Sequence, residues 1–438
     1  MPYLFKPLLS FILFAAWLHA VPVPKAVDDR ALNLEHYLEY RMQNKVDFSC
    51  KERTDGFVCS STKQKIVNSD ENATTVTVFE KARVRFNAAL ALRLQKETFD
   101  ATMKETEQIE RLRRQYLASK KPYLAPPSSP LKDALERALV GNLEAVNITG
   151  FSMQRDLPRT AFSIEELAFL NDMKRTAKGA AFTERILGEM RLDYRGALLE
   201  TNTSDAFYSM VPAMIEAWFD TNDTARADYV GKKLSSLYAE QLRSPFSGTM
   251  AVKTSYEGND TISVEIRTKN RNEKGAQDSF EFSGELRNAS TIFTPARKPL
   301  TPGTPDFLFK SMHSYSSADG SGYRDLLKRD KRFAAYIGAY DALFRTYFDQ
   351  KLKKYRYSAV LVKWFSQAKT AASKLLTGKA DTVEISVKNR DGVTAMQVFG
   401  MLMSQLMAIP QSPAQDRDGE KIVADTAASH LEIDIEAR

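Results

Sequence analysis

The chain has 438 residues, of which 43% are hydrophobic and 27% are charged, and its formal net charge is +7. At ~100–200 residues per domain, this length predicts two or three domains. The composition excludes fibrous and wholly disordered proteins. After the first twenty residues no apolar run reaches the ~18 residues needed to span a bilayer, which excludes a polytopic membrane protein.

The N-terminus has the parts of a secretory signal peptide. Met1–Lys6 carries one positive charge, Pro7–Trp17 is an apolar run, and Ala20 is a suitable residue for cleavage. We therefore expect residues 1–20 to be removed, which takes away Lys6 and lowers the net charge from +7 to +6. The alternative is that the segment stays as an uncleaved anchor. Export predicts a periplasmic or secreted protein, with no transmembrane helix after signal cleavage.

A β-hairpin is predicted around the only two cysteines. Extended segments flank an Asp-Gly turn signal, and their spacing sets Cys50 opposite Cys59. Opposed residues on antiparallel strands have Cα atoms ~4.5–5.5 Å apart, a distance that a disulfide spans. Because exported chains meet oxidising machinery, we expect the two cysteines to be bonded.

Six positions match the N-glycosylation sequon Asn-x-Ser/Thr. An acidic residue stands two places before four of them, Asn72, Asn202, Asn222 and Asn259, but not before Asn147 or Asn288. The extended motif resembles the acceptor of the Campylobacter-type bacterial N-glycosylation system. This resemblance implies that a periplasmic oligosaccharyltransferase modifies the four asparagines. The alternatives are coincidence in a polar chain, or a eukaryotic host whose acceptor does not need the acidic residue.

Helical and extended patterns alternate along the chain and predict an α+β fold. Two to three subdomains are expected, in which small antiparallel sheets of two to four strands are covered by long amphipathic helices. The N-terminal domain, 21–121, contains the hairpin, a strand at 76–86 and a long helix at 88–118. The central domain, 131–293, contains an apolar helix at 205–219 and an antiparallel meander at 248–256, 261–269 and 279–287. The C-terminal domain, 306–438, contains a Ser- and Gly-rich loop at 314–322, a basic helix and a strand-helix-strand segment. Pro-rich linkers at 122–130 and 294–305 separate the domains.

The motifs of the common enzyme and cofactor classes are missing from the sequence. After signal removal three histidines remain, His36, His313 and His430, and none has metal-ligand spacing, so we expect no cofactor and no metal. His313 lies beside Ser314 and Ser316, but neighbours in sequence do not establish a catalytic pair. The alternative function is a periplasmic hydrolase with a carboxylate-based site that no motif reveals.

Positive charge is concentrated between Phe307 and Lys379. Fifteen Lys and Arg residues stand there against five Asp residues, a local net charge of +10. Apolar residues recur at spacings of three and four from Phe333 to Val362, which predicts one face of a helix. Basic residues largely off that face predict a surface for an anionic partner. This surface comprises Lys328, Arg329, Lys331, Arg332, Lys351, Lys353 and Lys354. The simpler interpretation is a solvated helix face over an ordinary core stripe.

A methionine-rich segment, 393–407, contains Met396, Met401, Met403 and Met407. Methionine is common at adaptable apolar surfaces, so the segment suits either a groove for an acyl chain or a buried helix. Together these features predict a non-enzymatic, N-glycosylated envelope protein with a binding or scaffold role. Its candidate partners are an anionic lipid, bound between helices and sheet, or an acidic envelope protein. Nucleic acid is not an expected partner outside the cytoplasm.

Overall fold

The computed structural model describes most of the chain after residue 21. Residues 1–21, 43–44, 70–73, 119–128, 157–159, 178–179, 182–184, 243, 294–303, 318–321, 355–356, 399 and 402–418 are not described. The predicted signal peptide therefore lies outside the described residues. The described chain divides into two compact units, the first ending at Asp172 and the second beginning at Met173, inside the range predicted for the central domain.

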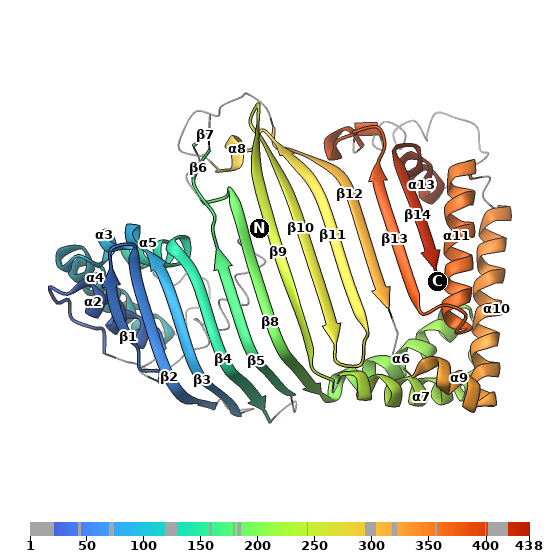
Figure 1. Ribbon diagram of the computed structural model, residues 1–438, viewed down its shortest axis with the longest axis horizontal. Coiled ribbons are helices and arrows are strands. Elements are labelled where there is room, and N and C mark those ends of the chain that lie inside the picture. Colours follow the sequence, from blue (N-terminus) through green and yellow to red (C-terminus); the bar gives the residue numbers. More distant parts are fainter. Residues whose placement is uncertain are drawn as a thin grey trace. The chain divides into compact units, whose positions relative to one another are not determined.

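The first unit is built on a five-stranded antiparallel sheet whose strands follow one another in chain order (Figure 1). The strands are β1 (Ser49–Arg53), β2 (Gly56–Ser69), β3 (Thr74–Asn87), β4 (Leu143–Arg155) and β5 (Thr160–Asn171). The helices are α2 (Arg30–Arg41), α3 (Ala91–Leu94), α4 (Lys96–Ala118) and α5 (Pro130–Asn142), with a 3₁₀ turn η1 (Ala88–Leu90) before α3.

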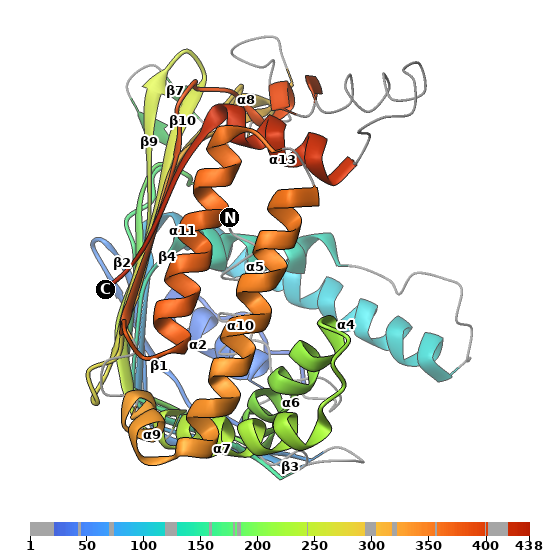
Figure 2. The same ribbon diagram turned by 90° about the vertical axis from the view of Figure 1, so that its right-hand side faces the viewer.

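One face of this first sheet is buried because its side chains alternate along each strand. Phe57 is paired with Phe86, and Cys59 with Val84, and all four side chains are buried. On α2 and α4, Tyr37 and Phe99 meet edge to face, with ring centroids 6.3 Å apart. The intervening residues of β3, such as Arg83 and Arg85, are exposed on the other face. Figure 2 shows the helices of the unit together on one side of the sheet.

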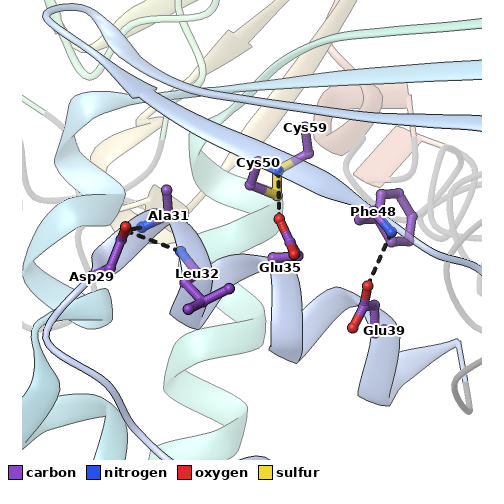
Figure 3. The surroundings of a disulfide bond; sticks show 8 residues. All are labelled: Asp29, Ala31, Leu32, Glu35, Glu39, Phe48, Cys50 and Cys59. Carbon is purple, nitrogen blue, oxygen red and sulfur yellow. Dashed lines mark hydrogen bonds between the residues drawn. A yellow bond between two sulfur atoms is a disulfide. The ribbon is translucent and has the colours of Figure 1, made fainter.

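Helix α2 lies along β1, the edge strand of this sheet (Figure 3). The Asp29 carboxylate caps the helix by accepting the N–H groups of Ala31 (2.8 Å) and Leu32 (3.1 Å). Further along α2, Glu35 accepts the N–H of Cys50 at 2.8 Å and Glu39 accepts the N–H of Phe48 at 3.1 Å. Carboxylates of α2 therefore satisfy backbone donors that a sheet edge otherwise leaves open.

The predicted pairing of Cys50 with Cys59 is confirmed. The two residues lie directly opposite each other on β1 and β2, with Cα atoms 4.0 Å apart, and their sulfur atoms are bonded. The N–H of Cys50 points away from β2, towards Glu35. The two cysteines thus form a non-hydrogen-bonded pair, in which side chains approach most closely.

The second unit contains a seven-stranded antiparallel sheet, again in chain order. Its strands are β8 (Gly188–Thr201), β9 (Phe246–Gly258), β10 (Thr261–Asn272), β11 (Gln277–Arg287), β12 (Asp306–Ser317), β13 (Thr382–Asn389) and β14 (Leu431–Ala437). A two-stranded ribbon, β6 (Thr176–Ala177) and β7 (Ala180–Ala181), precedes them. The helices are α6 (Asn202–Trp218), α7 (Thr224–Leu242), α8 (Ser290–Phe293), α9 (Tyr323–Arg329), α10 (Lys331–Lys354), α11 (Ala359–Leu376) and α13 (Gly419–His430).

The long helices of the second unit pack mainly on one another and on the last strands. Val230 of α7 packs with Phe333, Ile337 and Tyr340 of α10 in one buried cluster. Helix α11 contacts β14, where Ala371 packs with Ala437. Figure 2 shows α10 and α11 side by side on one side of this sheet. The predicted apolar face is confirmed for Phe333, Ile337 and Tyr340. Its predicted continuation to Val362 on the same helix is wrong, because α10 ends at Lys354 and Val362 belongs to α11.

The expected fold class is wrong in its architecture, although the mixture of helices and strands is as predicted. The sheets are not small: five strands in one unit and seven in the other continue as antiparallel neighbours. The predicted meander forms only β9, β10 and β11 of the larger sheet. Residues 314–317, predicted as part of a loop at 314–322, instead end β12, which pairs with both β11 and β13. Successive strands pair with each other even where helices lie between them in the chain, as α4 and α5 do between β3 and β4, so the helices do not divide the strands into small sheets.

Candidate functional site

The exposed face of α6 is apolar over its last nine residues. Met210, Ala213, Met214, Ala217 and Trp218 follow the three- and four-residue spacing of one helix face, and all are exposed. Their large members are among the most exposed apolar side chains described, at 57% for Met210, 62% for Met214 and 63% for Trp218. We call these five residues the α6 stripe. A continuous exposed apolar stripe on a helix indicates an interaction surface, unlike single exposed apolar residues.

The opposite face of α6 buries a charge. Glu216 is 3% exposed and forms a bidentate ion pair with Arg226 of α7, at 2.5 Å and 2.9 Å. The Arg226 guanidinium, with the Thr221 hydroxyl, lowers the pKa of Glu216 to about 2 despite its burial. The guanidinium also lies over the ring of Tyr340 on α10, 5.1 Å from its centroid. These contacts fix the orientation of α6 against α7 and α10, and they keep the α6 stripe outward.

The turn after α6 is held by the same glutamate. Asp220 has a left-handed backbone, with φ of 54°, and the Thr221 N–H donates to the Glu216 carbonyl at 3.0 Å, which ends the helix. The Asp223 N–H donates to the Glu216 carboxylate at 3.2 Å. Asn222 lies between them, exposed and at φ of 51°. Its backbone is therefore held in a defined turn four residues after Trp218.

Aromatic rings connect the α6 stripe to the basic end of α10. Trp218 contacts Tyr347 of α10 edge to face, with centroids 5.6 Å apart, and stacks on Phe219 at 5.7 Å. One turn further along α10, the Lys351 ammonium lies 5.7 Å from the centre of the Tyr347 ring. Lys353, two residues after Lys351, is exposed. The α6 stripe thus lies next to Lys351, near the end of α10 that also carries Lys353.

The seven predicted basic residues lie at two places rather than one. Lys328 and Arg329 end α9, and Lys331 and Arg332 begin α10, whereas Lys351, Lys353 and Lys354 end α10. At 1.5 Å per residue, the twenty residues from Lys331 to Lys351 separate the two groups by about 30 Å. Lysines at the C-terminal end of a helix also interact favourably with its dipole, so they stabilise the fold there. The side chain of Lys354 lies outside the described residues.

The group at the start of α10 is partly engaged in contacts of its own. The Arg332 guanidinium lies 4.4 Å from the ring centre of Tyr229, and its Nε donates to the Tyr336 hydroxyl at 3.2 Å. Next to it, the Phe333 N–H and the Lys233 ammonium lower the pKa of Asp330 to about 2. This group therefore includes an acidic residue and a stacked arginine, in contrast to the end with Lys351.

A shallow groove of about 340 Å³ lies between α9, α10 and the turn after α11. Lys328 lines it together with Arg324, whose guanidinium is paired with Asp381 at 2.5 Å. The groove is open to solvent and partly polar, so it does not resemble the acyl-chain cavity expected near the methionine-rich segment. Of that segment, Met396 is exposed, while Met403 and Met407 lie outside the described residues.

The described sequons differ in backbone setting. Asn222 and Asn259 lie in turns at positive φ, 51° and 49°, and are exposed; we call them the turn sequons. Asn288 also has a positive φ, but its side-chain amide donates to the Thr304 carbonyl at 2.8 Å. Asn147 lies within β4, between β3 and β5, and Asn202 is the first residue of α6. The remaining predicted acceptor, Asn72, lies outside the described residues.

The residues considered for catalysis do not come together. Because strand residues alternate, Ser314 and Ser316 of β12 face away from His313, which instead contacts Glu384 at 2.9 Å. Within the described ranges, no three His, Cys, Asp or Glu side chains are grouped as metal ligands. The described carboxyls with a resolved shift, Glu216 and Asp330 among them, all have a lowered pKa. A general acid needs a raised one.

Comparison with known proteins adds no relative: no protein-family model, curated protein or solved structure matches this chain. The helices that the structure describes include none that is both long and apolar enough to cross a bilayer.

The α6 stripe was not predicted from the sequence, although the helix that carries it was. Its sequence signal is the four-residue spacing of Met210, Met214 and Trp218. Glu216 stands on the opposite face, so hydrophobicity alone assigns the apolar side to the core. The exposed fractions in the folded chain reverse that assignment.

Proposed function

We propose that this protein is an exported peripheral membrane protein that docks the α6 stripe on an anionic bilayer, while Lys351 and Lys353 contact lipid headgroups. The single observation that carries the proposal is the exposure of Met210, Met214 and Trp218 on a helix whose charged residue is buried. The predicted signal peptide and disulfide support a role in the cell envelope. The proposed role is binding, without a chemical reaction.

The composition of this surface fits the boundary between lipid and water. Tryptophan is enriched at membrane interfaces, because its ring is largely apolar and its N–H remains near water. Lysine extends a flexible apolar stem and keeps its ammonium at the headgroups. Trp218 and Lys351 contact the same Tyr347 ring, so both side chains reach the interface together. An acidic protein would match the lysines but would not need the unbroken apolar stripe.

The energies predict weak, reversible binding. Complete burial of a large apolar side chain contributes about 1.5–3 kcal/mol. Because the three large members of the α6 stripe are already partly buried, docking would gain roughly half of that for each. Two lysines near an anionic surface add about 1 kcal/mol each. The total of about 6 kcal/mol corresponds to dissociation constants between millimolar and micromolar. Neither the stripe nor the lysines would be sufficient alone, as is usual for peripheral anchors.

Cosedimentation with vesicles tests the apolar part of the proposal. We expect the mature protein to sediment with phosphatidylcholine vesicles that contain one third phosphatidylglycerol, and much less with phosphatidylcholine alone. Replacing Met210 and Met214 with serine should reduce binding at least tenfold. The matched control replaces Leu92 and Leu170 with serine, which are 68% and 50% exposed and belong to the first unit. Equal losses in both double variants would refute a role for the stripe.

Charge reversal tests the electrostatic part. Lys351→Glu with Lys353→Glu should abolish most binding, and 0.5 M salt should do the same to the unchanged protein, since exposed charges are screened. The matched control is Lys328→Glu with Lys331→Glu, which changes the net charge equally at the other end of α10. Equal binding to vesicles with and without phosphatidylglycerol, or no binding to either, overturns the proposal. In the second case an acidic protein would be the partner to seek.

A further inference from the structure

The turn between α6 and α7 places a predicted modification site beside the α6 stripe. Asn222 is one of the turn sequons, with Asp220 two places before it and Thr224 two places after it. It is exposed and follows Trp218 by four residues. Four residues span at most about 14 Å, so the Cα atoms of Trp218 and Asn222 lie within that distance of each other.

This turn cannot swing away from the stripe without breaking the buried ion pair. The Glu216 carboxylate accepts the Asp223 N–H and the Thr221 hydroxyl, and it is held by Arg226. Asn222 is enclosed between these anchored residues, and its carbonyl accepts the Thr224 N–H at 3.0 Å. Any group attached to its side chain therefore stays near the end of α6.

We infer that glycosylation of Asn222 prevents the α6 stripe from docking on a membrane, so that only the chain unmodified at this site binds; this inference rests on the proposed function. A glycan is bulky and hydrophilic. An amphipathic helix lies about 5–10 Å deep at the boundary of headgroups and acyl chains. A glycan held beside Trp218 would have to enter that layer and lose its water, or keep the helix out.

Asn259 provides an internal control. It has the same acceptor motif and the same left-handed backbone, in the turn between β9 and β10. Figure 1 shows that this turn lies at the end of β9 away from α6 and α7. At about 3.3 Å per residue, the 13 residues of β9 span roughly 40 Å. A glycan there should not affect docking.

The first test uses protein from its native host. The protein is mixed with the phosphatidylglycerol-containing vesicles, and glycopeptides are measured by mass spectrometry in the bound and unbound fractions. Glycan at Asn222 should be depleted at least tenfold from the bound fraction, whereas occupancy of Asn259 should be equal in both. Equal occupancy of Asn222 in the two fractions, or no glycan at Asn222 at all, overturns the inference.

The second test separates this inference from the proposed function. Asn222→Cys and Asn259→Cys variants, produced without glycosylation and with the Cys50–Cys59 bond intact, are each compared before and after coupling to a 2-kDa polyethylene glycol maleimide. Coupling at position 222 should reduce vesicle binding at least tenfold, and coupling at 259 less than twofold. If the uncoupled proteins bind and coupling has no effect, or the same effect at both sites, the inference is wrong. If the uncoupled proteins do not bind, the proposed function itself falls.

Discussion

Replacing Glu216 with glutamine tests the idea that a buried ion pair holds α6 with its apolar face outward. The pKa of Glu216 is lowered from 4.5 to about 2, chiefly by the hydrogen-bonded guanidinium of Arg226. At 1.36 kcal/mol per pKa unit, ionisation of this carboxyl contributes about 3 kcal/mol to stability at neutral pH. Because the substitution also leaves Arg226 half-buried without its counterion, we expect the free energy of unfolding to fall by about 3–5 kcal/mol.

The lowered pKa of Glu216 also predicts how the effect of Glu216→Gln on stability changes with pH. A carboxyl with a lowered pKa stabilises the fold above its unfolded pKa, and the contribution is lost as the pH falls from about 4.5 towards 2. The difference between the unchanged protein and Glu216→Gln should therefore be largest at pH 7 and should shrink below pH 4.5. Urea unfolding followed by tryptophan fluorescence measures it, since Trp218 and Trp364 both belong to the second unit.

The control for this experiment is Asp228→Asn, which makes the same carboxyl-to-amide change at an exposed position of α7. It should alter the free energy of unfolding by less than about 0.5 kcal/mol. A loss below about 1 kcal/mol in Glu216→Gln at pH 7, or a difference between the proteins that stays constant down to pH 3, would refute the reasoning.

Three further predictions concern the two cysteines, two glycines and the sequons. Replacing Cys50 and Cys59 with serine opens a ten-residue loop and should cost about 2.7 kcal/mol in scanning calorimetry; no change would contradict the chain-entropy argument. Gly56→Ala should lower the free energy of unfolding in urea by more than about 2 kcal/mol, because φ is 145° there and a Cβ would collide with a β3 carbonyl. Gly338→Ala, in open space on α10, should raise it by about 1 kcal/mol. Reversed signs in this pair would show that the backbone argument is wrong. Glycopeptide mass spectrometry of the native protein should find glycan at the turn sequons and little at Asn288, whose amide is hydrogen-bonded; the reverse order would count against selection by backbone exposure.

The hairpin with the disulfide was predictable because its signals are local. An Asp-Gly turn and two short extended segments set the pairing of Cys50 with Cys59, and this pair occurs in the structure. No distant part of the chain is needed to set this register. The same holds for helix α6, which was predicted at 205–219 and forms at Asn202–Trp218.

The width of the sheets was not predictable, because it depends on pairing between distant segments. Residues 314–322 have the composition of a loop, yet Ser314–Ser317 continue β12 and pair with β13, about seventy residues later. Serine suits this segment because its hydroxyl can bond to the neighbouring strand: Ser316 of β12 donates to the Asp278 carboxylate of β11 at 2.6 Å. A polar strand lacks the alternation by which strands are recognised.

Only the basic half of the candidate site could be predicted from the sequence, for a similar reason. Charge density located the lysines at the end of α10, since charge can be counted along the sequence. The exposed stripe of α6 could not be located, because its orientation is decided by Arg226, which the chain brings back on the next helix. A helix with Met, Trp and a single Glu has its apolar side inward in most proteins.

The carboxylates of α2 that accept backbone N–H groups at β1 affect whether a strand of another chain can pair with this sheet edge. A free sheet edge accepts a further strand from another molecule, which is the first step of many fibres and of peptide capture. Here a strand arriving at β1 would have to displace Glu35 and Glu39 from the backbone N–H groups they hold, while the disulfide prevents β1 from separating from β2. The edge strand β1 is thus protected against pairing with a strand of another copy of the chain.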